Sequence, residues 1–404
     1  MAGERGARLR VALNASFWGQ ETIGSGQYLQ HLVEALALLP DGPAVELYGS
    51  QRLHAGSPLP GGVAWRDVPA SPWRRLGANL EKVWLEQVAF PRAARAARVA
   101  VAHVPYFASP LLPACPTVVT VHDLIPLVLP AYRSSALVRA YIGLVSRAAR
   151  RVALVLTDAE ATRAEIVRRL GIPEGRVRAV PLAAGPGFRP LSDAASLAEV
   201  RGRYGLPERY FLYLGGFDRR KNLATLFRAL AEAHRREPGL PVLAVAGALP
   251  PRETPLIPDP CRLAREAGVV EGVRFLGRVA EGDKPALYSG ATAFLFPSRY
   301  EGFGLPVLEA LACGVPVACA DATSLPEVAG PGGLLVGPDD VAGWADAILR
   351  LARDEALRAR LRALGLAHAS GFSWERTARE TAAAYRDVAI RPAGPAARDE
   401  GGNP

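Results

Sequence analysis

Two glutamates stand eight positions apart in the string FLFPSRYEGFGLPVLEALACGVPV. Glu301 precedes a glycine-containing turn, whereas Glu309 falls among leucines spaced by three, a pattern that predicts a helix beginning at Leu305. A loop carboxylate and a helix carboxylate would then line one cleft, with the free N–H groups of Phe303, Gly304 and Leu305 between them at the positive helix end. Carboxylates accept hydrogen bonds from hydroxyls and such N–H groups bind phosphate, so this stretch predicts a site for a phosphorylated polyol, and a nucleotide sugar has both groups.

The same string resembles a known signature. E-G-F-G-L-P-V-L-E is similar to the E-x7-E motif of retaining nucleotide-sugar glycosyltransferases of the GT-B fold, in particular the large family 4. The resemblance implies that Glu301 contacts the hydroxyls of the donor sugar, that Phe303, Gly304 and Leu305 lie at the sugar and phosphates, and that Glu309 binds the ribose. The alternative is an ordinary strand–helix unit whose acids face solvent.

A second chemical pattern is a pair of cations in YFLYLGGFDRRKNLATLFRAL, where Gly216 belongs to the turn and Arg220 and Lys221 follow it. Adjacent cations at a helix start oppose the helix dipole unless an anion is bound, so their position predicts a phosphate site. Lysine is also rare in this chain, with three among 48 basic residues. The string resembles the R-K-N motif of the same family, which implies that Arg220 and Lys221 neutralise the donor diphosphate and stabilise the departing nucleotide. The alternative is a solvated surface pair.

The first half of the chain opens on the strand pattern RLRVALNA and then on Gly24-Ser25-Gly26, which leads into a helical pattern. This order of strand, glycine turn and helix is typical of a doubly wound domain. Leu29 takes the place of the third glycine of a G-x-G-x-x-G fingerprint, which argues against a dinucleotide cofactor. By resemblance, the loop of Gly24, Ser25 and Gly26 touches donor phosphate or acceptor.

Two further residues enter as site candidates. His122 follows the buried-strand pattern TVVTV, and ligand groups collect at the carboxyl ends of parallel strands. The resemblance places His122 beside the donor sugar, while the alternative is a core histidine with satisfied hydrogen bonds. Arg278 lies where similar proteins hold the nucleotide base.

The elements that position these residues predict an α/β protein with two Rossmann-like, doubly wound domains that face each other across a cleft, which is the GT-B architecture. A segment rich in Pro, Gly, Ser and Asp at 186–207 indicates the boundary and a hinge. We therefore expect four parts. They are an acceptor-side domain (1–190), a nucleotide-sugar-binding domain (191–371), a C-terminal helix that crosses back to the first domain (372–390) and a disordered tail (391–404).

Composition limits the classes of protein to which this chain can belong. The chain has 404 residues, half of them hydrophobic, and no run reaches the roughly 18 apolar residues of a membrane span. Its start lacks the pattern of a secretory signal, and we expect a cytoplasmic protein. The four cysteines form no C-x-x-C pair and no Asp-x-Asp sequence occurs, so we expect no metal site.

Charge is uneven along the chain. Residues 1–190 hold 22 Lys and Arg against 13 Asp and Glu, while residues 191–404 hold 26 of each. The net charge of +9 therefore belongs to the first half. This bias indicates an acidic partner for that half, such as the inner face of an anionic membrane or a lipid diphosphate, or else a high-arginine surface without a specific partner. Nucleic acid also carries such charge, but its binding needs basic patches interleaved with stacking aromatics, and only the segment 72–98 hints at such a pattern.

By resemblance, the activity is retaining transfer of a hexose from a nucleotide-diphosphate sugar to a saccharide or lipid-linked saccharide, in surface polysaccharide or glycolipid biosynthesis. No cofactor is implied. The string around Lys221 and the string SLPEVAG look most like mannosyltransferases, so GDP-mannose is favoured over a UDP-sugar. The alternatives are a GT-B-fold nucleotide-sugar epimerase and a non-catalytic nucleotide-sugar-binding protein. An epimerase needs acid–base groups at the sugar, and the sequence offers no such constellation beyond His122 and Glu301. A non-catalytic binding protein would be expected to lose Glu301 or Lys221, and both are present.

Overall fold

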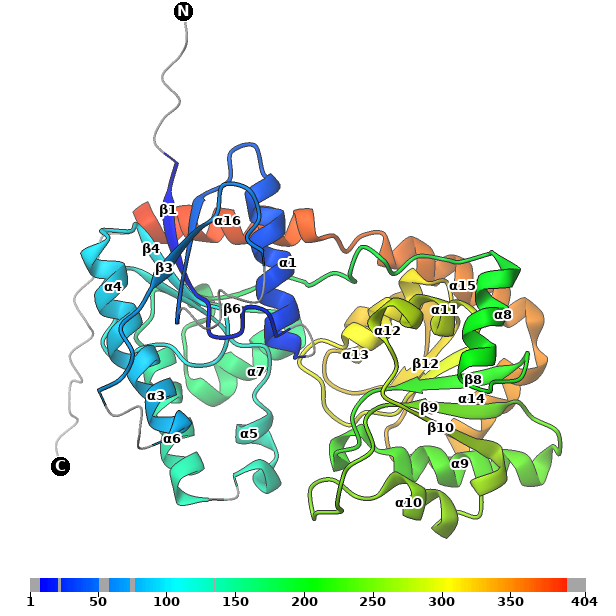
Figure 1. Ribbon diagram of the computed structural model, residues 1–404. Coiled ribbons are helices and arrows are strands. Elements are labelled where there is room, and N and C mark those ends of the chain that lie inside the picture. Colours follow the sequence, from blue (N-terminus) through cyan, green and yellow to red (C-terminus); the bar gives the residue numbers. More distant parts are fainter. Residues whose placement is uncertain (1–7, 21–22, 51–57, 73–76, 134, 391–404) are drawn as a thin grey trace, which may run out of the picture. The chain divides into compact units, whose positions relative to one another are not determined.

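The chain forms two compact units. The computed structural model describes residues 8–20, 23–50, 58–72, 77–133 and 135–390 (Figure 1). Unit 1 comprises Met1–Leu182 and Trp374–Pro404, and unit 2 comprises Ala183–Ser373. The expected tail, 391–404, lies outside the described residues.

Unit 1 is built on a seven-stranded sheet in the order β3-β2-β1-β4-β5-β6-β7, and each pair of neighbours is parallel. The central strands are short and completely buried, as expected of a parallel sheet covered on both faces. The strands are β1 Arg10–Asn14, β2 Ala44–Gly49, β3 Ala64–Asp67, β4 Val101–Val104, β5 Thr117–Thr120, β6 Leu154–Thr157 and β7 Val177–Ala179.

The helices of unit 1 connect these strands and cover the sheet. Helix α16, although last in sequence, belongs to this unit and contacts α1, β4 and β5. A π-helical turn, Leu85–Ala89, joins α3 to α4. The helices are α1 Gly24–Leu38, α3 Ala78–Trp84, α4 Phe90–Ala96, α5 Ile125–Val128, α6 Ala136–Ala149, α7 Glu160–Leu170 and α16 Trp374–Ile390.

Unit 2 repeats the plan with a six-stranded parallel sheet in the order β10-β9-β8-β11-β12-β13. Its strands are β8 Tyr210–Leu214, β9 Val242–Ala246, β10 Val273–Gly277, β11 Ala293–Phe296, β12 Val317–Ala320 and β13 Gly333–Val336. Its helices are α8 Ala194–Arg203, α9 Leu223–Arg236, α10 Pro260–Glu266, α11 Lys284–Ser289, α12 Leu305–Ala312, α13 Leu325–Ala329, α14 Val341–Arg353 and α15 Glu355–Ala369.

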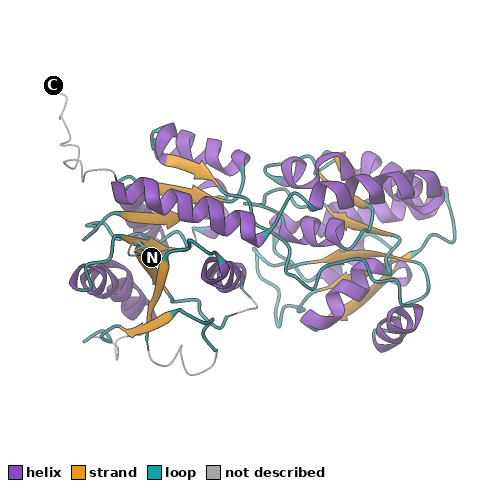
Figure 2. Cartoon of the chain, turned by 90° about the horizontal axis from the view of Figure 1, so that it is seen from above, coloured by secondary structure: helices purple, strands orange, loops and turns teal. Residues whose placement is uncertain are grey.

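In both sheets the strand order reverses beside the first strand of the unit, β1 in unit 1 and β8 in unit 2. That order is the doubly wound arrangement, in which ligands bind outside the carboxyl ends of the strands at the reversal point. Figure 2 shows the strands of each unit lying between layers of helices. The predicted α/β class with two Rossmann-like units is confirmed.

The segment that we expected to be an irregular boundary holds regular structure. The two units divide between Leu182 and Ala183, before the predicted range 186–207 begins. Within that range Asp193 caps α8 by accepting a hydrogen bond from the Ser196 N–H at 3.0 Å. The prediction missed this helix because Val200 is its single buried residue, which leaves almost no apolar periodicity to detect.

Candidate functional site

The two predicted cations lie in a tight turn between β8 and α9. Arg220 and Lys221 belong to a 3₁₀ turn, and Asn222 follows with φ of 60°, a left-handed conformation that asparagine tolerates. The Asn222 side chain donates to the carbonyls of Pro297 and Pro338, at 3.1 and 2.6 Å. The bond to Pro297 fixes the turn against the loop that follows β11, and the bond to Pro338 fixes it against the segment after β13. The strands β8 and β11 are neighbours in the sheet.

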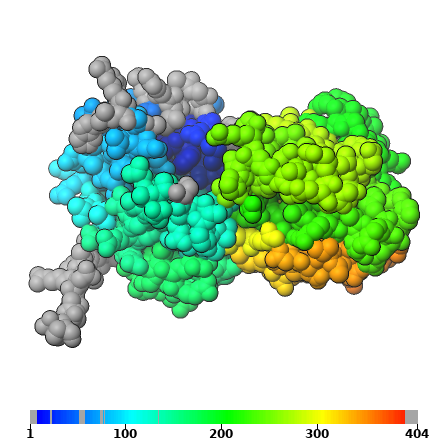
Figure 3. All heavy atoms as spheres, turned by 90° about the horizontal axis from the view of Figure 1, so that it is seen from below, coloured from blue at the N-terminus to red at the C-terminus, as the bar shows by residue number. Residues whose placement is uncertain are grey.

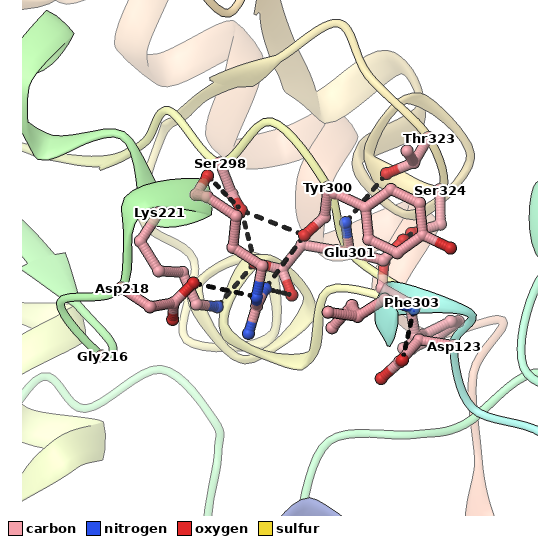
Figure 4. Close-up of polar contacts among 12 residues, drawn as sticks. Asp123, Gly216, Asp218, Lys221, Ser298, Tyr300, Glu301, Phe303, Thr323 and Ser324 are labelled. Carbon is pink, nitrogen blue, oxygen red and sulfur yellow. Dashed lines mark hydrogen bonds and ion pairs between the residues drawn. The ribbon is translucent and has the colours of Figure 1, made fainter. Parts of the chain in front are cut away.

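Glu301 is the partner of both cations (Figure 4). Its Oε1 lies 2.5 Å from the Lys221 Nζ, and its Oε2 lies 2.9 Å from the Arg220 Nη1. Ser298 donates a further hydrogen bond to Oε1 at 2.6 Å, and Asp218 pairs with the Arg220 Nε at 3.2 Å. We call these five residues the Glu301 cluster.

Electrostatics keep Glu301 ionised inside the protein. Burial alone would raise the pKa of the Glu301 carboxyl, but the charges of Lys221 and Arg220 and the hydrogen bond from Ser298 outweigh it, so the pKa is lowered. The Lys221 side chain is 9% exposed, and burial lowers its pKa despite the adjacent Glu301. The Lys221 Nζ also lies 4.9 Å from the centre of the Phe296 ring, a cation–π contact.

The structure changes the argument that led to a phosphate site. We reasoned that adjacent cations at a helix start require a bound anion, and the protein itself supplies one, the Glu301 carboxylate. With Asp218, the cluster holds two positive and two negative formal charges. A phosphate that used Arg220 or Lys221 would therefore have to share these cations with the carboxylates.

Helix α12 begins where the sequence predicts it, and its start is open to an anion. Gly304 has φ of 116°, and a Cβ there would lie 2.7 Å from a Leu325 methyl group, so both backbone and packing require glycine. Among the described residues, the N–H groups of Phe303, Gly304 and Leu305 donate to no protein acceptor. This arrangement can bind phosphate or a sugar oxygen.

Two residues that the sequence reading did not single out hold the Glu301 loop. The Thr323 hydroxyl accepts a hydrogen bond from the Glu301 N–H at 3.0 Å. The Ser324 hydroxyl donates to the carbonyls of Phe303 and Glu301, at 2.6 and 3.1 Å (Figure 4). Both residues lie directly before α13. Ser324 is the first residue of the string SLPEVAG, which was noted above only for its family resemblance.

Glu309 lies inside α12, as predicted, but in a network of its own. It is buried, and its Oε2 accepts a hydrogen bond from the Tyr288 hydroxyl of α11 at 3.0 Å. Burial raises the pKa of Glu309 to about 7, with a smaller opposing effect of Lys284. Glu309 is therefore partly protonated near neutral pH, unlike Glu301.

The remaining candidates of unit 2 lie at loop positions. Gly216 is exposed after β8, and its carbonyl accepts a hydrogen bond from the Tyr213 hydroxyl at 2.5 Å. Arg278 is exposed immediately after β10, at the edge of the sheet, and no contact within the described residues joins it to the Glu301 cluster. The sheet order separates β10 from β8 by β9.

His122 lies in unit 1 and both of its ring nitrogens are engaged. Its Nδ1 lies 2.7 Å from the buried Asp158 carboxylate, and its Nε2 lies 3.2 Å from the Pro105 carbonyl. Burial disfavours the imidazolium, but the Asp158 charge outweighs it, so the pKa of His122 is raised. The Tyr28 ring packs edge-on against the imidazole. With both ring nitrogens engaged by fixed partners, the imidazole is held in one orientation.

Gly24, Ser25 and Gly26 form the first turn of α1, so the predicted glycine loop is the helix start itself. No side chain caps this end, and the first turn has no acidic residue. A Cβ at Gly26 would lie 2.1 Å from the Gln20 carbonyl oxygen, which explains the glycine there. Gly24 has open space around it.

Unit 1 also holds a lysine–glutamate pair that the sequence reading missed. Glu86, on the π-helical turn, is completely buried; its Oε2 accepts from the Tyr141 hydroxyl at 2.9 Å, and its Oε1 lies 3.8 Å from the Lys82 Nζ. That ammonium lies over the rings of Tyr141 and Tyr106, at 5.2 and 5.9 Å. Burial raises the pKa of Glu86 to about 7. We call these four residues the Glu86 cluster.

The described part of the chain has neither a helix that could span a membrane nor a cluster of metal ligands. None of its helices combines the length and the apolar character that crossing a membrane needs. Within the same residues, no three His, Cys, Asp or Glu side chains come together in a way that could hold a metal ion.

Comparison with known families divides the chain much as the structure does. Residues 23–184 match the family model described as Glycosyltransferase Family 4, and residues 199–365 match the model described as Glycosyl transferases group 1.

Among curated proteins, the chain is 36% identical over 275 residues to the O-antigen chain mannosyltransferase B of Escherichia coli, covering 67% of this chain and 70% of that protein. It is 31% identical over 269 residues to the serotype-specific mannosyltransferase WbdA of Escherichia coli, covering 65% of this chain and 32% of that protein. Among solved structures, the sucrose-phosphate synthase of Thermosynechococcus elongatus superposes with a TM-score of 0.71 at 23% identity, over 94% of this chain and 99% of that one.

The mannosyltransferase match, at this identity and coverage, establishes the family, and the solved structure agrees with the fold of two parallel sheets. The chain belongs to the family 4 glycosyltransferases and has the GT-B fold.

Proposed function

We propose that this enzyme transfers a hexose, with mannose favoured, from a nucleotide-diphosphate sugar to a saccharide or lipid-linked saccharide during surface polysaccharide or glycolipid biosynthesis. The observation that carries the proposal is the Glu301 cluster beside the open start of α12. The names of the mannosyltransferase relatives support the choice of sugar.

The chemistry follows from charge. Departure of a nucleoside diphosphate builds negative charge on the leaving phosphate, and fixed cations stabilise that charge most effectively in a water-excluded site. Arg220 and Lys221 are held for this role by Glu301 and Asp218. We infer that a bound donor takes over part of the cations' coordination while Glu301 accepts hydrogen bonds from the sugar. The N–H groups at the start of α12 would supply the remaining phosphate contacts.

In a retaining transfer on one face of the sugar, the leaving diphosphate can itself accept the acceptor proton, so no general base is required. We infer that no divalent metal is required either, because Arg220 and Lys221 supply the positive charge. Transfer that is unchanged by EDTA supports this inference, and activity lost on chelation and restored by Mg²⁺ contradicts it.

The role proposed for Glu309 is to accept hydrogen bonds from the ribose hydroxyls. Only the carboxylate accepts through both oxygens, so donor affinity should increase as the pH rises through about 7, the pKa of this group. Replacement of Glu309 by Gln should abolish that pH dependence.

The epimerase alternative is not favoured, since the family established above is one of transferases and the ring nitrogens of His122 are both engaged. The proposal also includes peripheral contact with an anionic membrane through the basic unit 1, which would suit a lipid-linked acceptor.

A thermal-shift panel of GDP-mannose, UDP-glucose, UDP-N-acetylglucosamine, GDP and UDP tests the donor site, because a ligand that binds only the folded state raises the melting temperature. A shift with GDP-mannose and GDP supports the favoured donor, and a shift confined to the uridine ligands replaces it with a UDP-sugar. No shift with any ligand, together with no nucleotide release in the presence of acceptor extracts, contradicts the proposed function.

A further inference from the structure

A threonine with a left-handed backbone lies beside the Glu301 cluster. Among the described residues, three that are not glycine have a positive φ: Arg98 at 52°, Asn222 at 60° and Thr323 at 51°. Arg98 follows the end of α4, where left-handed residues are common, and asparagine tolerates this conformation. Threonine is branched at Cβ and rarely adopts it. The conformation of Thr323 therefore needs a reason of its own.

The strained residue belongs to a tight turn between β12 and α13. The turn comprises residues 322–325, and Thr323 is its second residue. The Leu325 N–H closes the turn by donating to the Ala322 carbonyl at 3.1 Å. A positive φ at the second position of a turn is adopted mainly by glycine, asparagine and aspartate. Glycine would thus suit this backbone better than threonine, and what threonine adds is a hydroxyl group.

That hydroxyl is used on Glu301. It accepts a hydrogen bond from the Glu301 N–H at 3.0 Å, while the neighbouring Ser324 hydroxyl donates to the Glu301 carbonyl at 3.1 Å (Figure 4). One turn therefore holds both backbone polar groups of Glu301. Thr323 itself is exposed, so its side chain fills no part of the core. Figure 3 shows atoms of this yellow part of the chain at the surface of unit 2.

The backbone of Glu301 matters most when a donor is bound. In the structure the carboxylate is paired with Lys221 and Arg220. Under the proposed function, the donor diphosphate draws on these two cations, which leaves the Ser298 hydroxyl as the remaining side-chain donor to the carboxylate. The carboxylate can then stay in register with the sugar only if its own backbone is fixed, and the Thr323 bond fixes that backbone at the Glu301 N–H.

We propose that Thr323 is a positioning residue of the donor site. It keeps an unfavourable backbone conformation because this conformation directs its hydroxyl to Glu301, and it acts on the donor sugar through the Glu301 carboxylate. The inference rests on the proposed function, which gives that carboxylate to the sugar hydroxyls. Strain that persists beside a functional group is expected where it serves to pre-organise that group.

The test measures the affinities of GDP-mannose and GDP by calorimetry, or of UDP-glucose and UDP if the thermal-shift panel selects the uridine ligands. Thr323→Val keeps the size and branching of the side chain but removes the hydroxyl. It should weaken binding of the nucleotide sugar by about tenfold, close to the worth of one hydrogen bond, and leave the nucleotide affinity within about twofold. Thr323→Ser should bind both ligands as the parent does. An equal loss for the two ligands would show a merely structural role and overturn the proposal, as would no loss for either.

A second background tests the route through Glu301. In a Glu301→Ala protein, Thr323→Val should cause no further loss of nucleotide-sugar affinity, because the group that it positions is absent. A further tenfold loss there would overturn the assignment to Glu301. If the Glu301→Ala protein does not fold, as circular dichroism would show, the comparison of Thr323→Val with Thr323→Ser decides the question alone.

Thr323→Gly separates strain from the hydrogen bond. It should bind the nucleotide sugar as weakly as Thr323→Val, yet melt about 2 °C higher than that variant, because glycine accepts the positive φ. The matched pair is Arg98→Gly and Arg98→Val, at the exposed left-handed residue of unit 1, which should differ in melting temperature in the same direction without changing either affinity. A Thr323→Gly protein that binds the nucleotide sugar as tightly as the parent would overturn the role of the hydroxyl.

The parent protein separates this proposal from the proposed function. If the parent binds neither a nucleotide sugar nor a nucleotide and releases no nucleotide with acceptor extracts, the proposed function fails and this inference fails with it. If the parent binds the nucleotide sugar and Thr323→Val binds it equally well, the inference alone fails and the donor site stands.

Discussion

Each unit of this enzyme holds a glutamate that is largely enclosed beside a lysine, Glu301 in unit 2 and Glu86 in unit 1, yet these two glutamates differ in charge. In the Glu301 cluster the Lys221 Nζ lies 2.5 Å from the carboxylate, with Arg220 and Ser298 as further donors. In the Glu86 cluster the Lys82 Nζ lies 3.8 Å away and Tyr141 is the hydrogen-bond donor. The pKa of Glu301 is lowered, whereas that of Glu86 is raised to about 7.

The difference shows that a lysine nearby does not by itself keep a buried carboxylate ionised. Burial raises the pKa in both clusters, and direct donors decide the outcome. Lys82 is 45% exposed, so water screens its charge, whereas Lys221 is enclosed with its partner. The Glu301 cluster therefore has fixed charges, while the Glu86 cluster can change its protonation near neutral pH.

Replacement of Glu301 by Gln should have the largest effect on stability. It leaves Arg220 and Lys221 without their shared carboxylate, and breaking a buried ion pair on one side costs about 3–5 kcal/mol. Because the folded pKa is lowered, the contribution of Glu301 is present at neutral pH and is lost as the pH falls through that pKa. Chemical denaturation over a series of pH values from 7 downward measures it. A variant that is as stable as the parent at pH 7 would contradict the ionised, paired state of Glu301.

Replacement of Lys221 by Ala should lower the rate of transfer by a factor on the order of 10² to 10³, the usual cost of removing one group that stabilises developing charge. Arg220 still pairs with Glu301, so the fold should persist. Nucleotide release at saturating donor measures the rate, and circular dichroism checks the fold. The matched substitution is Lys82→Ala, which should cost less than about tenfold; equal losses for the two lysines would remove the contrast between the clusters.

Replacement of Glu86 by Gln should stabilise the protein at alkaline pH, in contrast to the change at Glu301. Between about pH 4.5 and 7 the folded protein holds a proton on Glu86 that the unfolded chain has released, so this group lowers stability as the pH rises. The variant should gain up to about 3 kcal/mol relative to the parent from pH 4.5 to pH 8, at 1.36 kcal/mol per pKa unit. Denaturation curves at both pH values test the sign, and a variant less stable than the parent at pH 8 would show that Lys82 stabilises the ionised form.

Replacement of Tyr141 by Phe should have the smallest effect, a loss of about 1 kcal/mol at pH 8, because it removes one hydrogen bond to Glu86. The loss should be smaller at pH 5, where Glu86 is protonated. In the Glu86→Gln background the same change should cost less still, since the charged acceptor is gone. A cost that is independent of both pH and background would mean that the hydroxyl does not interact with the carboxylate.

Much of the fold follows from local patterns. The predicted start of α12 at Leu305 matches the structure, because apolar periodicity and glycine turns act over a few residues. Helix α8 and the π-helical turn escaped prediction. The first has one buried residue and the second differs from an α-helix in its hydrogen-bonding register, which leaves no distinct sequence pattern.

The candidate site, like the fold, could be predicted from the sequence only in part. The types of the key residues, their order and their membership in a glycosyltransferase family were evident from the sequence, and Gly304 could be recognised as part of a turn before a helix. The sequence reading did not show that Glu301 neutralises Arg220 and Lys221, that Thr323 and Ser324 hold its loop, or that both ring nitrogens of His122 are engaged.

The sequence by itself determined the class of the protein, the order of its elements and the residues available for chemistry, since these depend on short-range patterns and on motifs. Only the tertiary structure decided which charges meet. Lys221 and Glu301 are 80 positions apart and come together because β8 and β11 are neighbours in the sheet. The protonation of Glu301, Glu309 and Glu86 depends on burial and on donors within a few ångströms, and those distances are set by packing between elements far apart in the chain.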